Sequence, residues 1–499
     1  MRSPALLMLP MACSGDPEPP TAPSVAPPDV LLVVLDTVRA DRLQAWGHDR
    51  PTGLQVSALA ENGVRWAEAH APGSWTWPVH ASLFTGTPPW VHGAHFPPLG
   101  AATGAGFPAP RDDLPTLAER FAAAGYHTVA LSANCLLEPK LGLVRGFADA
   151  RCLDVPGQVE AEAEAVLRDR EAPLFLFVNL MPAHGPYSLT PVPWAAAHAG
   201  TLAAPGEALG PYIDPGPPPG VDLQRRAGAG GATGVQRVLQ GDLQLASDQW
   251  AMVRDLYDGE LVDADRRLMR IVEAWNTTGA RGVVAVTSDH GEHLGERGLV
   301  DHRGSVWPGL THVPLVIAAP GRLPAGAVVE RPVSLVDLPD TLLTLADVPG
   351  ATGPGLLRSD GSVDPAPARP VMAMAWPDPY RAAAVGGRWE RTWQMWTDGQ
   401  DRLVLDDVGG VQRFAADDPG LLRDLTADDP AATASLAVRA RADFGGPAFT
   451  GRPRRAGAET EGQLEALGYL QPAPGPEPAP SEDPAAATTP PEATDGSQR

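Results

Sequence analysis

Two unbroken apolar runs, each ending at an aspartate, constrain the fold of this chain most strongly. The run VLLVVL leads directly into Asp36, and the run VVAVTS leads directly into Asp289 and His290. Uninterrupted aliphatic runs of this length are typical of parallel strands that are covered on both faces. The sequence therefore predicts two buried strands whose carboxyl ends carry acidic side chains.

Similar apolar runs alternate with helical patterns along the chain. Further strands are expected at residues 128–132, 174–178 and 314–317, and helices at 114–124 and 249–274. Alternation of strands and helices is the pattern of a parallel sheet with helical connections. We therefore expect an α/β sandwich with a central, mostly parallel sheet flanked by helices.

The aspartates at the two strand ends are candidate metal ligands. Open parallel sheets hold their ligands beyond the carboxyl ends of the strands. Carboxylates in that position are partly desolvated, and they stay charged only beside a cation or strong hydrogen-bond donors. A single aspartate after a strand is commonly a helix N-cap. Two such aspartates, with a histidine beside the second, favour a metal site made of Asp36, Asp289 and His290.

The segment GSWTWPVHASLFTG, residues 73–86, predicts a helix that ends at Gly86, with Thr76 as its N-cap and Pro78 in its first turn. One interpretation is only a capped helix. The other places the Thr76 hydroxyl at a helix N-terminus, where free amide groups attract an anion. A metal ion beside this hydroxyl would lower its pKa and make it a nucleophile. The sequence leaves both interpretations open.

The charge balance excludes one class of partner. The chain has 38 Lys and Arg residues against 60 Asp and Glu residues, a formal net charge of −22. Such a chain is not expected to bind nucleic acid, which needs a basic face. An anionic substrate remains compatible with this charge, because a metal cation inverts the local field.

The cysteines and the N-terminal segment bear on the cellular compartment in which the protein is expected. Cys135 and Cys152 form either a disulfide or two buried free thiols. A short apolar run at residues 5–11 precedes Cys13 in the manner of a lipoprotein cleavage site. We therefore expect an exported periplasmic or cell-envelope lipoprotein that contacts the membrane only through a lipid anchor on Cys13, with an N-terminal tail of no special function as the alternative.

The domain organisation follows from changes in composition. Residues 1–27 are expected to be a leader and tether, residues 28–360 a catalytic domain, and residues 361–470 a smaller α+β subdomain. Within the catalytic domain, residues 188–245 are a long insertion, either a rim of the site or a segment without function. The Pro- and Ala-rich residues 471–499 are expected to be disordered.

Short antiparallel strands are expected in the subdomain at residues 382–398 and 402–414, with turns at the glycine pairs 386–387 and 409–410. A helix is expected near residues 431–444.

Several motifs resemble the sulfatase family of the alkaline phosphatase superfamily. DVLLVVLDTVRADRLQAWG, SWTWPVHASLFTG, VTSDHGEHLGERGLVDH and HVPLVIAAPG resemble four of its successive blocks. TLAERFAAAGYHTVALSAN and FVNLMPAHGPY resemble two more, and RFAADDPGLLRDL resembles its C-terminal subdomain. The blocks occur in the family's order over about residues 28–350. The resemblance implies an alkaline-phosphatase-like fold.

The resemblance also implies one divalent metal ion, held by Asp36, Asp289, His290 and the nucleophile position. Calcium is the expected ion, with manganese, magnesium and zinc as alternatives. The family's nucleophile is a Cys or Ser in a C/S-x-P-x-R motif, oxidised to formylglycine. Here Thr76 and His80 occupy the first and last motif positions. Because threonine cannot become formylglycine, no formylglycine is expected, and Thr76 itself is the candidate nucleophile.

Three further residues match family positions around the transferred group. His184 corresponds to a histidine that contacts the sulfuryl or phosphoryl oxygens, and His302 to a Lys or His that protonates the leaving oxygen. Asn134 corresponds to a position near the bound anion. Arg39 is expected to pair with Asp36 or Asp41 and has no expected catalytic role.

The predicted function is metal-assisted hydrolysis of a sulfate, phosphate or phosphonate ester of a small molecule or glycan. Thr76 would attack, His302 would protonate the leaving oxygen, and His80 and His184 would neutralise charge on the other oxygens. The competing hypothesis is a catalytically degenerate relative that binds an anionic glycan or headgroup at the cell surface.

Overall fold

The computed structural model describes residues 27–96, 106–187, 234–445, 451–455 and 460, apart from residues 154, 156, 171, 172, 186, 354, 359–361, 364–368 and 419. Within these residues the main sheet contains nine strands, in the order β11-β2-β10-β7-β1-β6-β4-β5, and β12 pairs with β2. The strands are β1 (Asp29–Leu35), β2 (Val64–His70), β4 (His127–Ser132), β5 (Asp149–Cys152), β6 (Leu174–Leu180), β7 (Gly282–Thr287), β10 (His312–Ala318), β11 (Ala327–Val329) and β12 (Val333–Ser334).

The strands of the main sheet are mostly parallel, as predicted. β1 pairs in parallel with β6 and β7, and β4 pairs in parallel with β6 and β5. β11 and β12 are parallel to β2, whereas β10 is antiparallel to both of its neighbours, β7 and β2. The carboxyl ends of β7, β1, β6 and β4 therefore lie side by side along one edge.

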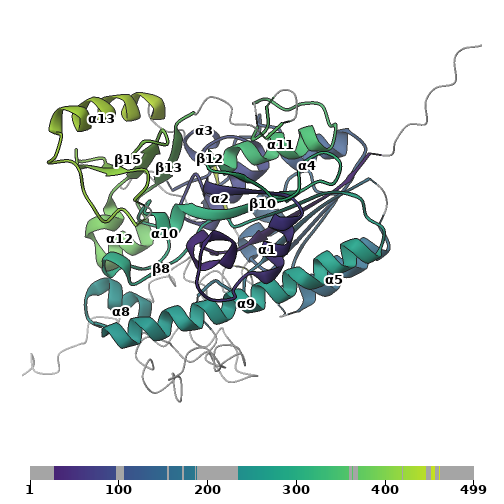
Figure 1. Ribbon diagram of the computed structural model, residues 1–499, viewed down its shortest axis with the longest axis horizontal. Coiled ribbons are helices and arrows are strands. Elements are labelled where there is room, and N and C mark those ends of the chain that lie inside the picture. The colour runs from purple at the N-terminus through teal and green to yellow at the C-terminus, as the bar shows by residue number, and fades with distance from the viewer. Residues whose placement is uncertain are drawn as a thin grey trace, which may run out of the picture.

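Helices cover both faces of this sheet (Figure 1). One face packs against α2 (Thr76–Thr85), α4 (Leu117–Ala123) and α11 (Leu338–Leu345), and the other against α1 (Leu54–Glu61), α5 (Gln158–Arg168) and α9 (Ser247–Thr277). Every residue of β1 is buried: Val30 and Leu32 face the first layer, while Leu31 and Val33 face the second. This two-sided burial explains why the strand is apolar at every position instead of alternating.

Two elements differ from the sequence prediction. β2 was not predicted, because Arg65 and Glu68 interrupt its apolar pattern. The helix expected at 114–124 begins only at Leu117, because Thr116 caps it in a capping box with Glu119. In that arrangement the Thr116 hydroxyl accepts from the Glu119 amide and the Glu119 carboxylate accepts from the Thr116 amide, which fixes the first helical turn.

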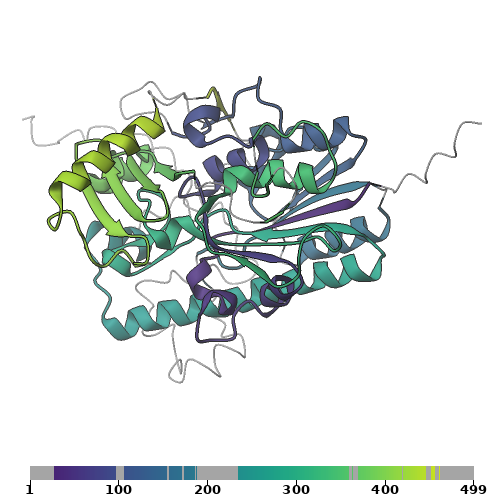
Figure 2. The same ribbon diagram turned by 45° about the horizontal axis from the view of Figure 1, so that its top comes forward.

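A smaller antiparallel sheet follows near the C-terminus (Figure 2). It consists of β13 (Val371–Ala375), β14 (Trp393–Thr397), β15 (Asp401–Asp406) and β16 (Val411–Ala415), in that order. One face packs against α13 (Pro430–Phe444), as the apolar contacts of Trp396 with this helix show. The other face packs against Leu299, Val306 and Trp307 of the main domain. The small sheet is thus joined to the main domain through an apolar interface.

The strand expected at residues 382–398 is partly wrong. Its first half forms the helix α12 (Pro379–Val385) and the 3-10 helix η8 (Gly387–Glu390), and only β14 is extended. Asp378 explains the helix, because its carboxylate accepts a hydrogen bond from the Arg381 amide at 3.1 Å, as an N-cap does, and the alanines that follow favour a helix. The turn at residues 409–410 and the helix α13 agree with the prediction.

Shorter elements complete the described fold. They are β3 (Phe107–Pro108), which pairs with β17 (Pro453–Arg454), β8 (His293–Leu294), which pairs with β9 (Val300–Asp301), and the helices α3 (Pro89–His92), α8 (Gly234–Gln240) and α10 (Pro308–Thr311). The end of the predicted 188–245 insertion thus forms α8. Residues 188–233, the leader at 1–26 and the tail at 471–499 lie outside the described residues.

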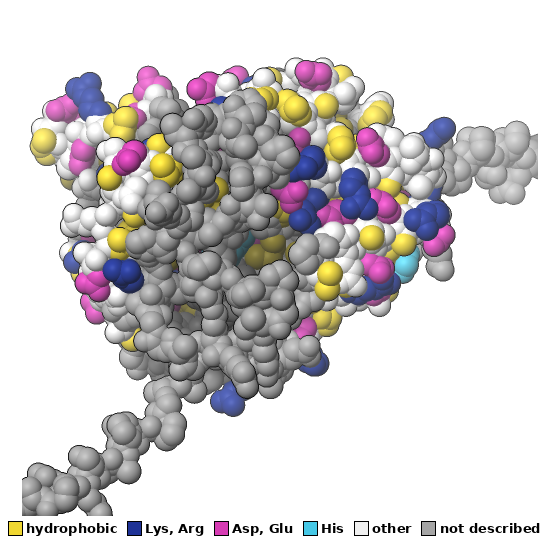
Figure 3. Space-filling model, turned by 90° about the horizontal axis from the view of Figure 1, so that it is seen from below, with side chains coloured by type: hydrophobic (Ala, Val, Ile, Leu, Met, Phe, Trp, Pro, Cys, Tyr) yellow, Lys and Arg dark blue, Asp and Glu magenta, His cyan; other side chains and the backbone are white. Residues whose placement is uncertain are grey.

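Charged side chains of both signs are interspersed on the described part of the face that carries α5 and α9 (Figure 3). Arg267 of α9 forms an ion pair with Glu160 of α5 at 2.9 Å, and Arg270 pairs with Glu164 at 2.7 Å. Among the described helices, none is both long enough and apolar enough to cross a bilayer.

Candidate metal centre

The three metal ligands predicted from the sequence lie together at the carboxyl edge of the main sheet. Asp36 directly follows β1, and Asp289 and His290 follow the neighbouring strand β7. One ligand atom from each of these three residues lies within 4.8 Å of the others, and all three side chains are fully buried. His290 Nε2 is 3.4 Å from Asp289 Oδ2 and 3.9 Å from Asp36 Oδ1.

In each of the two aspartate carboxylates, only one oxygen accepts hydrogen bonds from the described residues. Asp36 Oδ2 accepts hydrogen bonds from the amides of Asn134 at 3.0 Å and Asn179 at 3.2 Å. Asp289 Oδ1 accepts from the backbone amides of Thr37 at 3.2 Å and His290 at 2.9 Å. Asp36 Oδ1 and Asp289 Oδ2 have no hydrogen-bond partner among the described residues, although both are buried.

This arrangement fits a divalent cation. Burial, together with the negative charge of Asp36, raises the pKa of Asp289 well above its usual range. Two buried carboxylates this close cannot both stay charged without a nearby cation. The two oxygens without partners and His290 Nε2 would supply the oxygen and nitrogen ligands of such an ion.

His290 is oriented as a metal ligand. Its Nδ1 lies 2.9 Å from the Gly291 carbonyl, which can only accept, so Nδ1 carries the proton and Nε2 presents its lone pair to the aspartates. Burial and the nearby His302 lower the pKa of His290 well below its usual range. The ring is therefore neutral, as coordination to a metal requires.

Thr76 lies beside this cluster, at the start of α2. The predicted N-cap is wrong by one residue: Thr76 is the first residue of the helix, and extended Trp75 occupies the cap position without a side-chain cap bond. The Thr76 hydroxyl oxygen is 3.4 Å from His290 Nε2, and it accepts a hydrogen bond from Asn134 Nδ2 at 3.4 Å. The Thr76 hydroxyl therefore lies against His290 and Asn134, at the edge of the candidate metal cluster.

His80 lies one turn after Thr76 and is fully buried. Its Nδ1 is 3.0 Å from the Thr76 carbonyl oxygen and 3.6 Å from Asp289 Oδ2. Burial lowers the pKa of His80 to about 4, against the opposing effect of Asp36. The structure therefore brings His80 to the cluster, with a neutral ring at neutral pH.

A second cluster of acidic and histidine side chains lies next to the first. It consists of Glu292, Asp301 and His302, whose ligand atoms also lie within 4.8 Å of one another. The ring of His302 is 4.6 Å from that of His290 and 5.0 Å from that of His184, between centroids. His184, His290 and His302, three of the four predicted site histidines, therefore lie next to one another.

Arg39 does not contact the metal cluster. It forms ion pairs with Asp41 at 2.7 Å and Glu296 at 2.8 Å, so the expected alternative of a pair with Asp36 is wrong. These two charges raise the pKa of the Arg39 guanidinium although burial opposes the shift.

Three features of the site were not predicted from the sequence: the contact of Asn179 with Asp36, the contact of Glu292 with His302, and the hydrogen bond that holds Asn134 beside Asp36. Asn179 is a polar residue within the apolar run LFLFVNL of β6, and that interruption was the available signal. Asn134 is followed by Cys135, which forms a disulfide with Cys152, so the alternative of free thiols is wrong. The disulfide ties the loop after β4 to the neighbouring strand β5 and restrains Asn134 beside Asp36.

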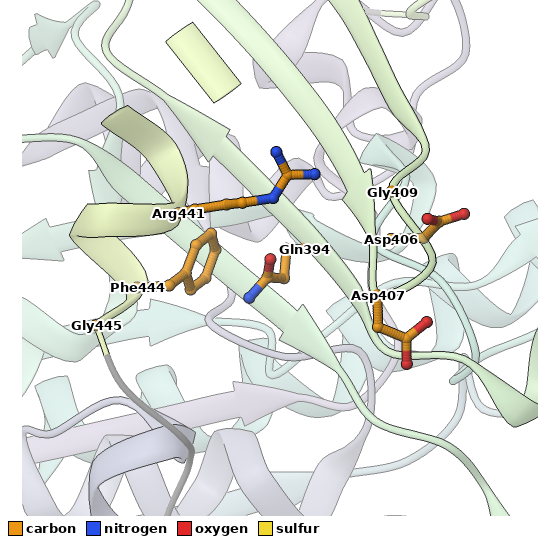
Figure 4. A pocket seen from close by; sticks show the side chains of 7 residues that line it. All are labelled: Gln394, Asp406, Asp407, Gly409, Arg441, Phe444 and Gly445. Carbon is orange, nitrogen blue, oxygen red and sulfur yellow. The ribbon is translucent and has the colours of Figure 1, made fainter. Parts of the chain in front are cut away.

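Two hollows lie away from the buried cluster. One, of about 430 Å³, is on the small sheet, where Arg441 and Phe444 of α13 lie beside Gln394 and the turn that contains Asp406 (Figure 4). The other, of about 550 Å³, includes Trp307 in its lining. Neither lining includes a ligand of the metal cluster, so we assign neither to the site.

Short segments of the chain match curated arylsulfatases. The chain is 38% identical over 103 residues to arylsulfatase K of Danio rerio and 33% identical over 105 residues to arylsulfatase A of Bos taurus. These segments cover 20% and 21% of this chain and 19% and 20% of the relatives. The matched segments thus span about a fifth of the length of either relative.

Solved structures resemble the chain over most of its length. The phosphonate monoester hydrolase of Agrobacterium radiobacter has a TM-score of 0.60 and 21% identity, over 84% of this chain and 95% of that one. A protein solved with its substrate D-glucosamine-2-N,6-O-disulfate has a TM-score of 0.61 and 16% identity, over 84% and 99%. The model of the sulfatase family matches residues 28–136 and 158–348. The chain, whose metal-ligand cluster lies within these matched residues, therefore belongs to the sulfatase family.

Proposed function

We propose that this chain is a metal-dependent hydrolase of sulfate, phosphate or phosphonate esters, with Thr76 as its nucleophile. The observation that carries the proposal is the position of the Thr76 hydroxyl oxygen, 3.4 Å from His290 Nε2 and beside the two half-satisfied carboxylates. A divalent cation held by Asp36, Asp289 and His290 would lower the pKa of this hydroxyl and neutralise charge on the substrate. Thr76 is also held by Asn134, which limits its rotation.

The reaction proceeds in two displacements. Once the Thr76 hydroxyl has lost its proton to solvent, its oxygen forms a bond to sulfur or phosphorus. The bond to the leaving oxygen breaks as that oxygen takes a proton from His302. Water then cleaves the threonine ester and returns a proton to His302. Asn134, which contacts Asp36 and Thr76, and His184, whose ring centroid is 5.0 Å from that of His302, would bind the non-bridging oxygens. His80 joins them when the anionic substrate favours its protonated form.

The threonine sets an expectation about substrate class. A formylglycine hydrate can eliminate its bound sulfate, whereas a threonine ester must be hydrolysed directly. We therefore expect slow turnover of sulfate esters and a preference for phosphoryl or phosphonyl esters. The phosphonate monoester hydrolases among the structural neighbours support this class, and the neighbour solved with a sulfated glucosamine keeps small glycan sulfates within it. Calcium remains the expected ion, with manganese, magnesium and zinc as alternatives.

The proposed compartment is the periplasm or cell envelope. The Cys135–Cys152 disulfide supports an oxidising compartment. Lipidation at Cys13 stays a prediction, since that residue lies outside the described part of the chain.

The test is a panel of aryl sulfate, phosphomonoester, phosphodiester and phosphonate substrates with calcium, magnesium, manganese and zinc. Thr76→Ala should reduce turnover of the best substrate by about a thousandfold or more. Thr85→Ala is the matched control, because Thr85 is buried on the same helix and its hydroxyl bonds the Ala81 carbonyl and the Thr87 hydroxyl, neither of which belongs to the cluster. Unchanged turnover in Thr76→Ala would refute the nucleophile, and metal binding without any turnover would favour a binding protein.

A further inference from the structure

The loop that carries His302 has an unusual backbone. Asp301 and Arg303 have φ values of 65° and 72°, in the left-handed region that side chains other than glycine rarely adopt. Gly304, which follows, has a φ of 57°. Two such non-glycine residues around one histidine persist only where surrounding contacts determine the conformation. The position of His302 therefore depends on what holds residues 301–304.

Several of those contacts come from the C-terminal subdomain. Arg381 of α12 forms an ion pair with Asp301 Oδ2. Asp378, at the start of the same helix, pairs with Arg303 at 2.9 Å. The Arg388 guanidinium donates to the Gly304 carbonyl at 3.2 Å. The main domain adds the Ser74 carbonyl, which accepts from the Arg303 amide at 2.9 Å.

Gly304 shows how closely the subdomain approaches. A Cβ atom added at this position would collide with the ring of Trp389 in η8. The Arg381 guanidinium lies 5.0 Å from the centre of that same ring. Arg381 is therefore itself fixed between an aromatic ring and a carboxylate.

Asp301 connects Arg381 to the histidine. Its Oδ2 faces Arg381, while its Oδ1 accepts from the His302 amide at 2.6 Å and lies 2.8 Å from His302 Nδ1. Glu292 approaches the same ring nitrogen at 3.4 Å. The carboxylates of Asp301 and Glu292 thus both lie beside His302 Nδ1. The other ring nitrogen, Nε2, is on the opposite side of the ring from them.

We propose that Arg381 is a positioning residue for the leaving-group step: through Asp301 it fixes the ring of His302 beside His290 and the metal cluster. This inference rests on the proposed function, and it assigns to the C-terminal subdomain a part in the chemistry. The Glu292–Asp301–His302 cluster then holds a proton donor in place and is not a second metal site. Its carboxylates face cationic protein groups, because Asp301 Oδ2 pairs with Arg381 and Asp301 Oδ1 with His302.

The kinetic test compares esters of the class that the unmodified protein hydrolyses. A proton donor matters most when the leaving oxygen is strongly basic. In Arg381→Ala we expect kcat for a phenyl ester to fall about tenfold or more and that for a 4-nitrophenyl ester to fall less than about threefold. Arg381→Lys, which keeps the charge without the planar fork, should recover part of the loss. Equal losses for both esters would overturn the proposal.

The matched control is Arg413→Ala. Arg413 lies in the same subdomain and pairs with Asp401 at 2.7 Å, with side chains 18% and 20% exposed, close to the 14% of both Arg381 and Asp301. Arg413→Ala should not lower kcat for the phenyl ester more than kcat for the 4-nitrophenyl ester.

Hydrogen exchange separates this inference from the proposed function. Amides of residues 299–305 should exchange faster in Arg381→Ala than in the unmodified protein or in Arg413→Ala, and unchanged exchange would overturn the proposal. Absence of turnover by the unmodified protein would refute the proposed function, whereas selective exchange at 299–305 would still support the link from Arg381 to the His302 loop.

Discussion

Two clusters of acidic and histidine residues lie next to each other, and their differences decide their roles. In the Asp36–Asp289–His290 cluster each carboxylate keeps one buried oxygen without a partner among the described residues. In the Glu292–Asp301–His302 cluster the carboxylates face His302, and Arg381 supplies a further positive charge. A buried acidic cluster is stable only with a counter-cation. Among the described residues the first cluster has no cationic partner such as Arg381 and could hold a cation from solution, whereas the second has its own.

The largest expected effect tests the first cluster. Asp289→Asn should weaken divalent metal binding by more than about a hundredfold, because removing a direct ligand should exceed the loss caused by an outer hydrogen-bond partner. Turnover should fall with it. Metal content of the purified protein and titration with the ion give the measurement. Asp301→Asn is the control and should keep its metal; an equal loss in both variants would contradict the distinction.

The next effect tests the second cluster. His302→Gln should leave metal content unchanged and lower turnover of esters with basic leaving groups by about a hundredfold or more, because the proton donor is lost. Kinetics with phenyl and 4-nitrophenyl esters check this. His290→Gln should instead lose the metal. If His302→Gln also lost the metal, the two clusters would be one site.

A smaller effect is expected from Asn179, whose amide donates to Asp36 Oδ2 at 3.2 Å. Asn179→Ala should weaken metal binding by about tenfold to a hundredfold, as loss of an outer partner does. Isothermal titration with the metal ion measures the change. Asn62→Ala, at an exposed helix end, should leave the affinity unaltered.

The smallest effect is a pH dependence of stability in the metal-free protein. Burial lowers the pKa of His302, but Asp301 and Glu292 outweigh it and raise the pKa from 6.5 to about 9. A group whose pKa is higher in the folded state stabilises the fold fully below the unfolded pKa. That contribution disappears as the pH rises through the folded pKa. With a chelator present, the free energy of unfolding should fall between about pH 6.5 and 9, and His302→Gln should flatten this change. A fall of equal size in His302→Gln would contradict it.

The sequence predicts the first cluster well because its determinants are local. Asp36 and Asp289 each follow a continuous apolar run, and neighbouring parallel strands bring their ends together whatever the rest of the chain does. Thr76 could be placed at a helix start, but its approach to His290, 214 residues away, depends on how α2 packs across the sheet.

The second cluster could be predicted only in part. His302 was found by resemblance, but Arg381, the partner of Asp301, lies 80 residues beyond that aspartate. It belongs to a helix in a region where the glycine pair 386–387 had suggested a hairpin. The alanines of α12 and the Asp378 cap favour the helix, so local propensity did contain that signal. The strand β2 was missed for the opposite reason: Arg65 and Glu68 obscure it, although its pairing with β10 places it within the sheet.

The apolar contact of the small sheet with Leu299, Val306 and Trp307 has a consequence for how such a chain can be divided. The candidate metal ligands Asp36, Asp289 and His290 precede residue 291, and the stretch that matches the family model ends at residue 348. A fragment cut there would keep every ligand but would expose these three side chains and release the loop between β9 and α10. In a chimera that joins the main domain of one family member to the C-terminal subdomain of another, the loop that carries His302 and the helix α12 should therefore come from the same parent if the chimera is to be active.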